Sequence, residues 1–285
     1  MKRAIALMMV LCLLSAAESS AGPYPPAAGE TGSTAVPSDH QAIVAWASGW
    51  EDYVPGPEAD AVWQTPDKAV GPPDGTVYDV VCLGRGGRLT MTFNTPISDR
   101  TGWDFAVFEN GFRDTFLELA YVEVSSDGVN FVRFDSVSLT ALPVNGFGAV
   151  DPTDVDGLAG KYRLGYGTPF DLSDLAGKPE VIANRVDLTS ITRVRFIDIV
   201  GDGSCQDTDG RPIHDPYPTY QSAGLDLNAV AVLSGIPKPA PTTTGDAPTS
   251  SGEAGVGEIG GPGGGGCFVD AAGGGASLSW NENLK

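Results

Sequence analysis

The chain has 285 residues, of which 36 are acidic and 17 are basic, so its net charge is -19 at pH 7. Such a charge repels phosphate backbones and anionic lipids, and we therefore expect neither nucleic acid nor a membrane surface as a partner. Because 41% of the residues are hydrophobic, the sequence predicts a folded protein rather than a disordered polyelectrolyte.

The first 21 residues predict that the protein is exported. Lys2 and Arg3 precede an apolar run at residues 4–14, and small residues follow up to Ala21. This order is typical of a secretory signal peptide that is cleaved after Ala21. Cleavage removes two bases and one acid and leaves a net charge of about -20. No later segment approaches the roughly 20 apolar residues of a membrane span, so we expect a mature chain without a transmembrane segment, at the cell surface or outside the cell.

Composition divides the remaining chain into three parts. Residues 22–40 are rich in Pro, Ala, Gly and Ser and predict a disordered leader, and residues 237–285 predict a disordered tail rich in Pro, Thr and Gly. Residues 41–236 alternate short strand patterns with Gly, Pro and Asp turns and show no sustained helical period. They predict an all-β fold, an antiparallel β-sandwich with about eight strands and long loops. The expected strands are Ala42 to Trp46, Val77 to Leu83, Arg88 to Phe93, Trp103 to Phe108, Leu117 to Ser125, Val129 to Phe134, Val186 to Leu188, Val194 to Val200 and Leu225 to Leu233.

Aspartates are concentrated in the last part of the predicted sandwich. Asp198 and Asp226 lie on two flanking strands, and Asp202, Asp207 and Asp209 lie in the Gly-rich loop between them. Carboxylates this close in sequence repel one another unless a cation or many backbone amides absorb their charge, and hard oxygen ligands on a flexible loop suit Ca²⁺. The sequence therefore predicts a structural Ca²⁺ site. The alternative is a solvated turn in which the aspartates accept hydrogen bonds from their own backbone. The spacing does not fit an EF-hand.

Cys82 and Cys205 are the two cysteines between the signal peptide and the tail. Outside the cytosol a disulfide can persist, and we expect these two residues to form one, which would tie the acidic loop to the strand at residues 80–83. The alternative is a pair of buried free thiols.

Four segments resemble parts of one known family. Residues 103–112, Trp-Asp-Phe-Ala-Val-Phe-Glu-Asn-Gly-Phe, and residues 121–131, with the hairpin pattern Val-Ser-x-Asp-Gly-x-x-Phe, resemble bacterial cell-surface proteins with a galactose-binding-like (discoidin-type) jelly roll. Residues 66–75 resemble the loop that follows the first strand of these domains, and residues 224–230 resemble their closing strand. The resemblance covers about residues 41–234.

The resemblance implies a structural Ca²⁺ between an early loop and the last strand. Its ligands would be Asp74 and Asp226, with Glu109 and Asp198 as further candidates, and whether this site coincides with the acidic loop is open at this point. The Gly-rich stretch before Cys267 resembles the spacer of C-terminal sorting signals in Gram-negative bacteria. Acidic and amidic residues replace the apolar helix of such signals, so simple secretion is the alternative to anchoring.

Motifs that carry catalysis are scarce. The chain has two histidines, His40 and His214, and lacks the nucleophile elbow, the zinc-protease motif and the P-loop. We expect a non-catalytic binding module for extracellular glycan, in which aromatic side chains of loops and strand ends stack on sugar rings. The candidates are Trp50, Tyr53, Trp63, Tyr217 and Tyr220. The alternatives are a structural or adhesive surface component that binds another protein and, less favoured, a glycoside-active enzyme with paired carboxylates.

Overall fold

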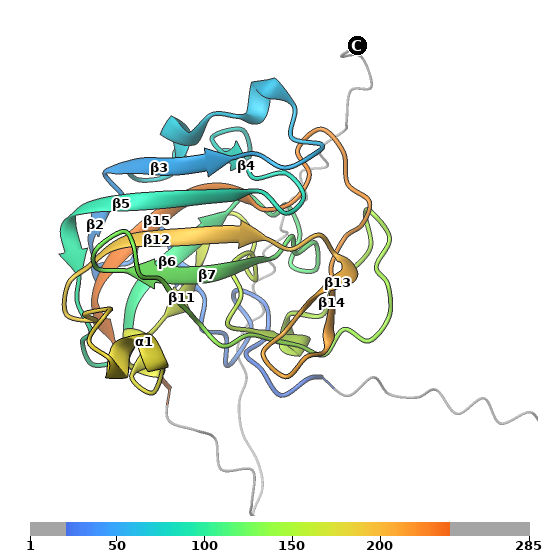
Figure 1. Cartoon of the computed structure of the whole chain (residues 1–285). Coiled ribbons are helices and arrows are strands. Elements are labelled where there is room, and N and C mark those ends of the chain that lie inside the picture. Colours follow the sequence, from blue (N-terminus) through green and yellow to red (C-terminus); the bar gives the residue numbers. More distant parts are fainter. Residues whose placement is uncertain (1–20, 240–285) are drawn as a thin grey trace, which may run out of the picture. The chain divides into compact units, whose positions relative to one another are not determined.

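Two antiparallel β-sheets packed face to face form the described part of the protein, which in this computed structural model comprises residues 21–239 (Figure 1). This arrangement confirms the predicted β-sandwich. The first sheet contains, in spatial order, β1 (Val36–Pro37), β11 (Tyr166–Phe170), β6 (Trp103–Glu109), β15 (Asp226–Ile236) and β2 (Ile43–Trp46), and β4 (Val81–Cys82) also pairs with β15. The second sheet contains β3 (Gly49–Val54), β5 (Arg88–Ile97), β12 (Ile191–Asp198), β7 (Ala120–Ser125) and β8 (Val132–Arg133).

Two small strand pairs and five short helices connect the sheets. The pairs are β9 (Val137–Ser138) with β10 (Val155–Asp156), and β13 (Asp202–Gln206) with β14 (Pro212–His214). The helices are η1 (Ala61–Trp63), η2 (Pro66–Ala69), η3 (Pro152–Asp154), η4 (Leu172–Leu175) and α1 (Pro179–Ile182). None of the helices within residues 21–239 is long and apolar enough to cross a bilayer.

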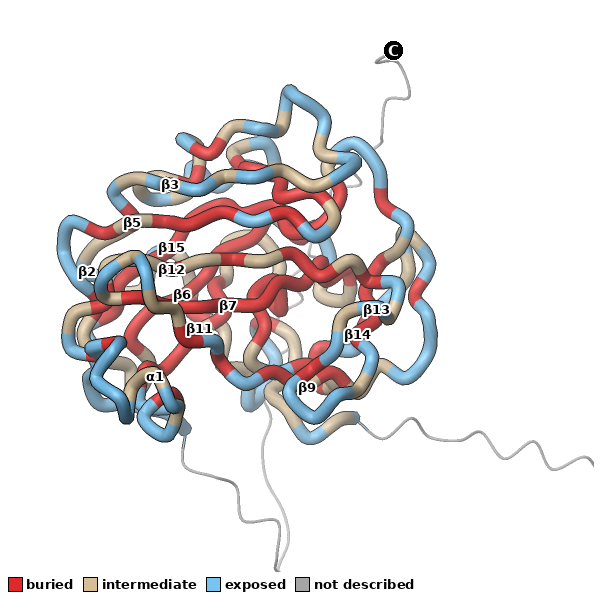
Figure 2. Tube along the Cα trace, viewed as in Figure 1, coloured by how far each residue is buried: buried red, intermediate tan, exposed pale blue. Residues whose placement is uncertain are grey.

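The main core lies between the two sheets (Figure 2). In β12, Val194 and Phe196 point into this core while Arg193 and Arg195 face outward, as the period of two along a strand requires. Strands β6 and β15 are different, because they are buried along almost their whole length. Their second face packs against a smaller cluster that includes Val36 of β1.

The segment predicted as a disordered leader is part of the fold, so that prediction was wrong. β1 pairs with β11, the Ser38 amide donates to the Gly165 carbonyl, and the Tyr24 amide donates to the Thr153 carbonyl. The composition of this segment conceals the fact that it closes an open edge of the first sheet and covers that sheet's outer face. The domain also extends past Ile236, because Lys238 forms ion pairs with two aspartates. The predicted signal peptide up to Ser20 and the tail from Ala240 lie outside the described residues.

Most predicted strands exist, although their bounds shift and their number is larger than about eight. The expected strand at residues 77–83 shortens to β4, and the one expected at residues 186–188 is absent from the described structure. β3 and β11 were not predicted. β11 contains Gly167 and Pro169, which weaken a strand signal, and it is a strand because β6 and β1 pair with it on either side.

Candidate functional site

Five buried carboxyl groups gather at one end of the sandwich, and we call them the buried acid cluster: Glu109, Glu118, Asp198, Asp215 and Asp226. Because β15 runs antiparallel to β6, the beginning of β15 meets the end of β6, and Asp226 and Glu109 come together there. Asp198 is the last residue of β12. Glu118 and Asp215 belong to the connections before β7 and after β14. The topology thus brings together acids that are far apart in sequence.

Backbone amides of several loops donate to the buried acid cluster. Asp198 accepts from the Gly86 amide at 2.9 Å and the Leu225 amide at 2.7 Å, Asp215 from the Leu119 amide at 2.9 Å, Glu109 from the Gly111 amide at 2.6 Å and Glu118 from the Gly224 amide at 3.2 Å. These donors explain why the loops converge on this end, since a buried carboxyl that accepts no hydrogen bond is costly.

Two buried oxygen atoms of the site have no hydrogen-bond partner within the described residues. They are Oδ1 of Asp226 and Oδ1 of Asn228, two residues further along β15. The other oxygen of Asp226, Oδ2, accepts a long hydrogen bond of 3.4 Å from the side-chain amide Nδ2 of Asn110. The side-chain amides of Asn110 and Asn228 donate to the Val77 and Asp79 carbonyls. Buried acceptors without a donor are rare in folded proteins and indicate a place for a proton, a water or a cation.

Burial raises the pKa of every member of the buried acid cluster. The pKa values of Glu109, Glu118, Asp198 and Asp215 lie well above their ordinary range, and the pKa of Asp226 rises to about 7. Repulsion adds to burial, because Asp226 acts on Glu109, Glu118 and Asp198. None of the ion pairs in residues 21–239 includes a member of the cluster. At neutral pH these carboxyls therefore need protons or a cation.

The other predicted metal ligands lie elsewhere. Asp202, Asp207 and Asp209 belong to β13, β14 and the turn that joins them, a unit that we call the acidic hairpin. Asp207 accepts hydrogen bonds from its own turn and from Arg211, whose Nε lies 2.7 Å from Asp207 Oδ2 and whose Nη2 lies 2.7 Å from Asp209 Oδ2. Asp202 accepts from the Ser204 amide at 2.9 Å. The hairpin thus gives each of its acids hydrogen-bond donors of its own, and Arg211 supplies a positive charge to two of them.

Asp74 lies on an exposed turn and accepts a hydrogen bond from the Thr76 amide at 2.7 Å. Of the seven predicted ligands, the structure therefore unites Asp198, Asp226 and Glu109 in the buried acid cluster.

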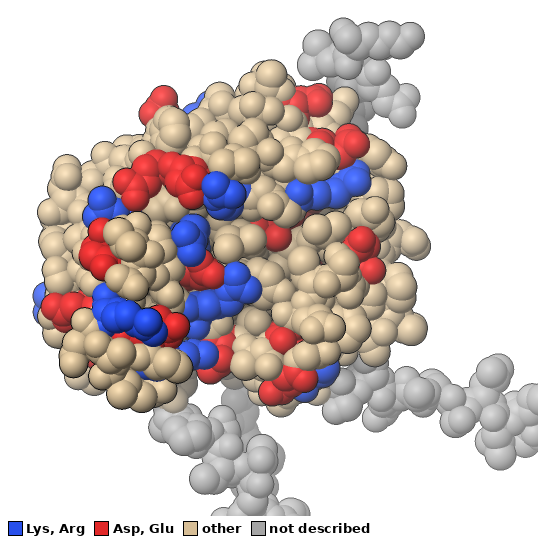
Figure 3. Space-filling view, in the orientation of Figure 1, with Lys and Arg blue, Asp and Glu red and all other residues tan. Residues whose placement is uncertain are grey.

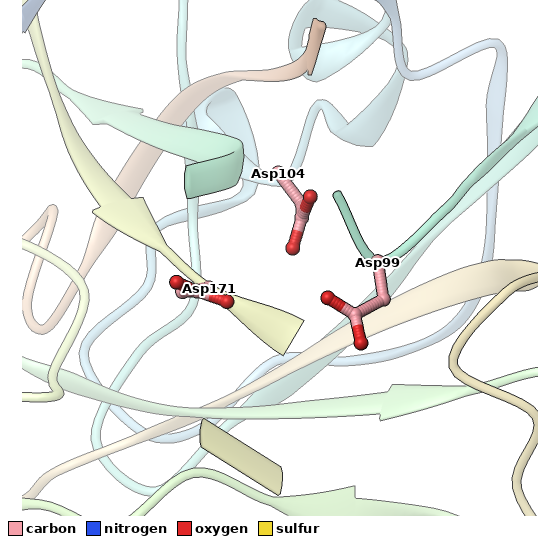
Figure 4. A group of neighbouring side chains, drawn as sticks. All are labelled: Asp99, Asp104 and Asp171. Carbon is pink, nitrogen blue, oxygen red and sulfur yellow. The ribbon is translucent and has the colours of Figure 1, made fainter. Parts of the chain in front are cut away.

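A second group of acids, Asp99, Asp104 and Asp171, lies at the opposite end of β6 (Figure 4). Within residues 21–239 this is the one group in which three carboxylates place oxygen atoms within 4.8 Å of one another. Both oxygens of Asp104 accept backbone hydrogen bonds, from the Arg100 and Leu172 amides, at 2.8 Å each. Lys238 Nζ lies 3.1 Å from Asp171 Oδ2. A lysine therefore already pairs with one of the three carboxylates of this group.

The five predicted ligand-binding aromatics fall into three groups. Tyr217 and Tyr220 lie against the Arg85 guanidinium, at 5.1 and 5.4 Å from their ring centroids. Trp63 stacks on Tyr78 with a centroid distance of 6.4 Å. Tyr220 and Tyr78 are 63% and 64% exposed.

The loops that carry these two groups are joined, and we call the group of Trp63, Tyr78, Tyr217, Tyr220 and Arg85 the aromatic edge. Asp60, just before η1, donates its amide to the Gln221 carbonyl at 2.7 Å, and Ala59 pairs with Ser222. The aromatic edge thus combines three predicted residues, Trp63, Tyr217 and Tyr220, with Tyr78 and Arg85, which were not predicted.

Trp50 and Tyr53 form the third group, on β3. Their rings meet edge to face at 6.4 Å. Tyr53 packs against the main core and donates its hydroxyl to the Cys82 carbonyl at 2.7 Å, and Trp50 donates to Asp67 at 2.8 Å. Tyr53 therefore has a structural role.

Charged side chains of both signs gather over the outer face of the second sheet (Figure 3). Arg193 pairs with Glu51 and Arg88 with Asp52, while Glu123 lies between Arg195 and Arg133. The Arg195 guanidinium also lies 3.6 Å from the centroid of the Phe131 ring. Ion pairs therefore occupy much of this face.

Four polar residues of the site were not predicted: Glu118, Asp215, Asn110 and Asn228. Glu118 carries a detectable signal, because it interrupts the apolar run from Phe116 to Leu119, where a charged residue is buried only if it has partners. Asn228 similarly stands within the apolar pattern of β15.

The predicted disulfide is not present, because Cys82 and Cys205 are both free thiols. Cys82 lies in β4 next to Asp226 and donates its thiol to the Ala223 carbonyl at 3.0 Å. Cys205 lies in β13 and packs against a separate small cluster of apolar residues. The disulfide was predicted because Cys82 and Cys205 are the two cysteines between the signal peptide and the tail. That argument takes no account of where the strands lie, so it could not predict that the two cysteines belong to separate parts of the fold.

No protein-family model matches the chain, and no curated protein matches its sequence. Function is therefore inferred from the geometry of the described residues.

Proposed function

We propose that the chain is an exported, non-catalytic binding module whose buried acid cluster holds a structural Ca²⁺ and whose aromatic edge binds a neutral extracellular glycan. The observation that carries the proposal is the burial of five carboxyls with no lysine or arginine paired to them in residues 21–239, beside two acceptor oxygens that have no donor.

The chemistry of the residues fits a hard divalent cation, because Glu109, Glu118 and Asp226 offer carboxylate oxygens and Asn228 offers the unpartnered amide oxygen Oδ1, the ligand types that Ca²⁺ prefers. The three carboxylates do not place oxygens within 4.8 Å of one another, so a bound ion would have to draw them closer together. The bound ion would supply positive charge where the chain supplies none. It would thereby join the ends of β6 and β15 to the connection before β7, and it would take no part in a reaction.

Several observations support a binding role rather than catalysis. The five carboxyls are buried, so they are poorly placed to exchange protons with a substrate. The aromatic edge, in contrast, presents exposed rings next to Arg85, which donates to the Thr219 carbonyl at 2.7 Å. Exposed rings and polar donors suit sugar rings, and the strongly negative chain disfavours anionic ligands. Export is inferred from residues 1–21.

Calorimetry and thermal melting of the mature chain, residues 22–285, test the metal. We expect binding of Ca²⁺ alone, and a chelator should lower Tm by roughly 5 to 10 °C, since a hundredfold excess over Kd contributes about 2.7 kcal/mol. Asp226→Asn should abolish the response to calcium, and the matched variant Asp209→Asn in the acidic hairpin should keep it. Absence of both binding and a chelator effect would remove the metal from the proposal.

An array of neutral glycans tests the ligand class. The calcium-loaded chain should bind a subset of them, and Tyr220→Ala and Tyr78→Ala should each weaken that binding while Tm stays unchanged, because both side chains are mostly exposed. Trp50→Ala on β3 is the control, and it should leave glycan binding intact. If calcium binds but no glycan does, the glycan part of the proposal fails.

A second candidate function, adhesion to another protein, is favoured by a different surface. Phe112 and Phe147 are 52% and 77% exposed, and both stack on Phe116, at 4.6 and 6.1 Å between centroids. Arg113 lies over two of these rings. An exposed aromatic cluster with an arginine is typical of the centre of a protein interface.

A further inference from the structure

Gly22, the first residue after the predicted cleavage position, is held against helix η3. Its backbone nitrogen donates to Thr153 Oγ1 at 2.6 Å, and the amide of Tyr24 donates to the Thr153 carbonyl at 3.1 Å. Two hydrogen bonds within three residues therefore define the path of the chain at this point.

Two acids lie near Gly22. The Thr153 hydroxyl that accepts from Gly22 itself donates to Asp151 Oδ1 at 2.7 Å, so Gly22, Thr153 and Asp151 form a continuous hydrogen-bonded chain. The Asp154 carboxylate is close to the Gly22 backbone, and the pKa of Asp154 is raised by burial and then by Asp151. Neither aspartate takes part in an ion pair within residues 21–239.

The contact leaves no room for a side chain at position 22. A Cβ atom on Gly22 would lie 2.5 Å from Asp154 Oδ1 and 2.2 Å from the Thr153 carbonyl oxygen, distances that real Cβ atoms essentially never adopt. The backbone therefore approaches the Asp154 carboxylate as closely as only glycine permits.

We infer that Asp151, Thr153 and Asp154 form a docking site for the α-ammonium group of Gly22 that cleavage after Ala21 creates. This inference rests on the proposed export of the chain. Hydrolysis of the Ala21–Gly22 peptide bond by a signal peptidase consumes one water and leaves a carboxylate on Ala21 and an ammonium on Gly22. The neutral amide with one hydrogen becomes a cation with three, near two acids that form no ion pair within residues 21–239.

Docking would couple removal of the signal peptide to completion of the fold. The segment that begins at Gly22 continues into β1, which closes the edge of the first sheet at β11 and contributes Val36 to its outer cluster. An ion pair at the start of this segment would hold it in place after processing. The site recognises a terminal ammonium on glycine, and a chain extended by even one residue cannot supply it.

Two versions of the protein test the inference. One starts with a free Gly22, produced by removing an N-terminal carrier, and the other is identical but keeps Ser19, Ser20 and Ala21 in front of it. We expect the chain with free Gly22 to melt higher by roughly 2 to 4 °C, the shift that one well-placed charge pair produces in a domain of this size. Asp154→Asn should reduce this difference to below about 1 °C in the same comparison.

Equal melting temperatures for the two versions would overturn the docking site, and so would a difference that survives Asp154→Asn. Sequencing the amino terminus of the exported protein provides the second measurement. Gly22 as first residue supports the inference, and any other first residue overturns it for the natural protein. Calcium binding is measured on the same chains, so that failure of the docking site and failure of the proposed metal site are distinguishable.

Discussion

The acidic hairpin and the buried acid cluster both concentrate negative charge, yet they neutralise it in different ways. In the hairpin, Arg211 lies 2.7 Å from both Asp207 and Asp209, and the turn's own amides complete the hydrogen bonds. Burial alone would raise the pKa of Asp207, but hydrogen bonds from Arg211 and Ser138 outweigh it and the pKa is lowered. In the cluster none of the bases within residues 21–239 pairs with the acids, and burial raises every pKa.

This difference shows that the density of aspartates along a sequence is a poor guide to a metal site. The hairpin has the highest density and satisfies itself locally, because residues two to four apart can form a turn with its own arginine. The cluster is assembled from five distant segments, and its members compete for a few backbone donors. Four predictions test the contrast, beginning with the largest expected effect.

Gly224→Ala should destabilise the protein severely, whereas Gly210→Ala should have a small effect. Both glycines have positive φ, at 74° and 82°, so both variants carry the same backbone strain. A Cβ at position 224 would lie 2.3 Å from Asp198 Oδ1, while one at position 210 in the hairpin would have open space, with no atom of another described residue beyond its chain neighbours within 4 Å. We expect the free energy of unfolding to fall by at least about 3 kcal/mol in Gly224→Ala and by about 1 kcal/mol in Gly210→Ala. Urea denaturation measures both, and similar losses would contradict the assigned crowding around Asp198.

Arg211→Ala should lower Tm by a few degrees, and added calcium should not restore it. The variant leaves the buried Asp207 carboxylate without its base, while the cluster is untouched. Arg185→Ala is the control, because the exposed Arg185 guanidinium lies 3.9 Å from its half-buried partner Glu180 and should contribute nothing measurable. Recovery of Tm by calcium would mean that the hairpin does bind the ion.

Stability in the presence of a chelator should fall as pH rises from about 4 to about 6. Burial raises the pKa of Asp104 to about 6, above the value of about 3.9 in an unfolded chain. The folded state therefore binds the proton more tightly, and this contribution is present below pH 4 and lost as pH passes 6. Asp104 and the buried acid cluster both contribute to this fall of stability with pH, and they act in the same direction.

In Asp104→Asn the free energy of unfolding should fall less with pH than in the unmodified protein, as measured by urea denaturation at pH 4.5, 5.5 and 6.5. Asp127→Asn is the control, because hydrogen bonds led by that from Asn130 lower the pKa of Asp127 and place its effect below this range. An unchanged slope in Asp104→Asn would mean that Asp104 is ionised throughout.

Reducing agent should leave Tm unchanged, the smallest effect of the four, because Cys82 and Cys205 are free thiols. In the folded protein a thiol reagent should modify Cys205 first. Cys82 is buried next to the cluster, and burial together with Asp226 raises its pKa. In denaturant both should react. Mass spectrometry of digested protein measures the order, and recovery of a Cys82–Cys205 peptide pair would restore the disulfide originally expected from the sequence.

The sequence alone predicted the β-sandwich and most of its long strands, since alternating apolar residues and Gly–Asp turns are local properties. It also singled out Asp198 and Asp226, because acids on two apolar strands that flank an acidic loop stand out, while Glu109 was a candidate only through the family resemblance. It could not predict that Glu118 and Asp215 join them, because that depends on which loops meet when β15 pairs with β6.

Tertiary structure likewise decided the fate of the segment at residues 22–40 and of the two cysteines. Nothing in a Pro- and Ala-rich segment indicates order, and only the open edge at β11 makes pairing of Val36 favourable. Arg211 neutralises Asp207 because a turn brings them into contact, and no base reaches Asp226 because strands surround it. The contact between Arg211 and Asp207 follows from their spacing in the sequence. The isolation of Asp226 follows from its burial, which depends on how the whole chain folds.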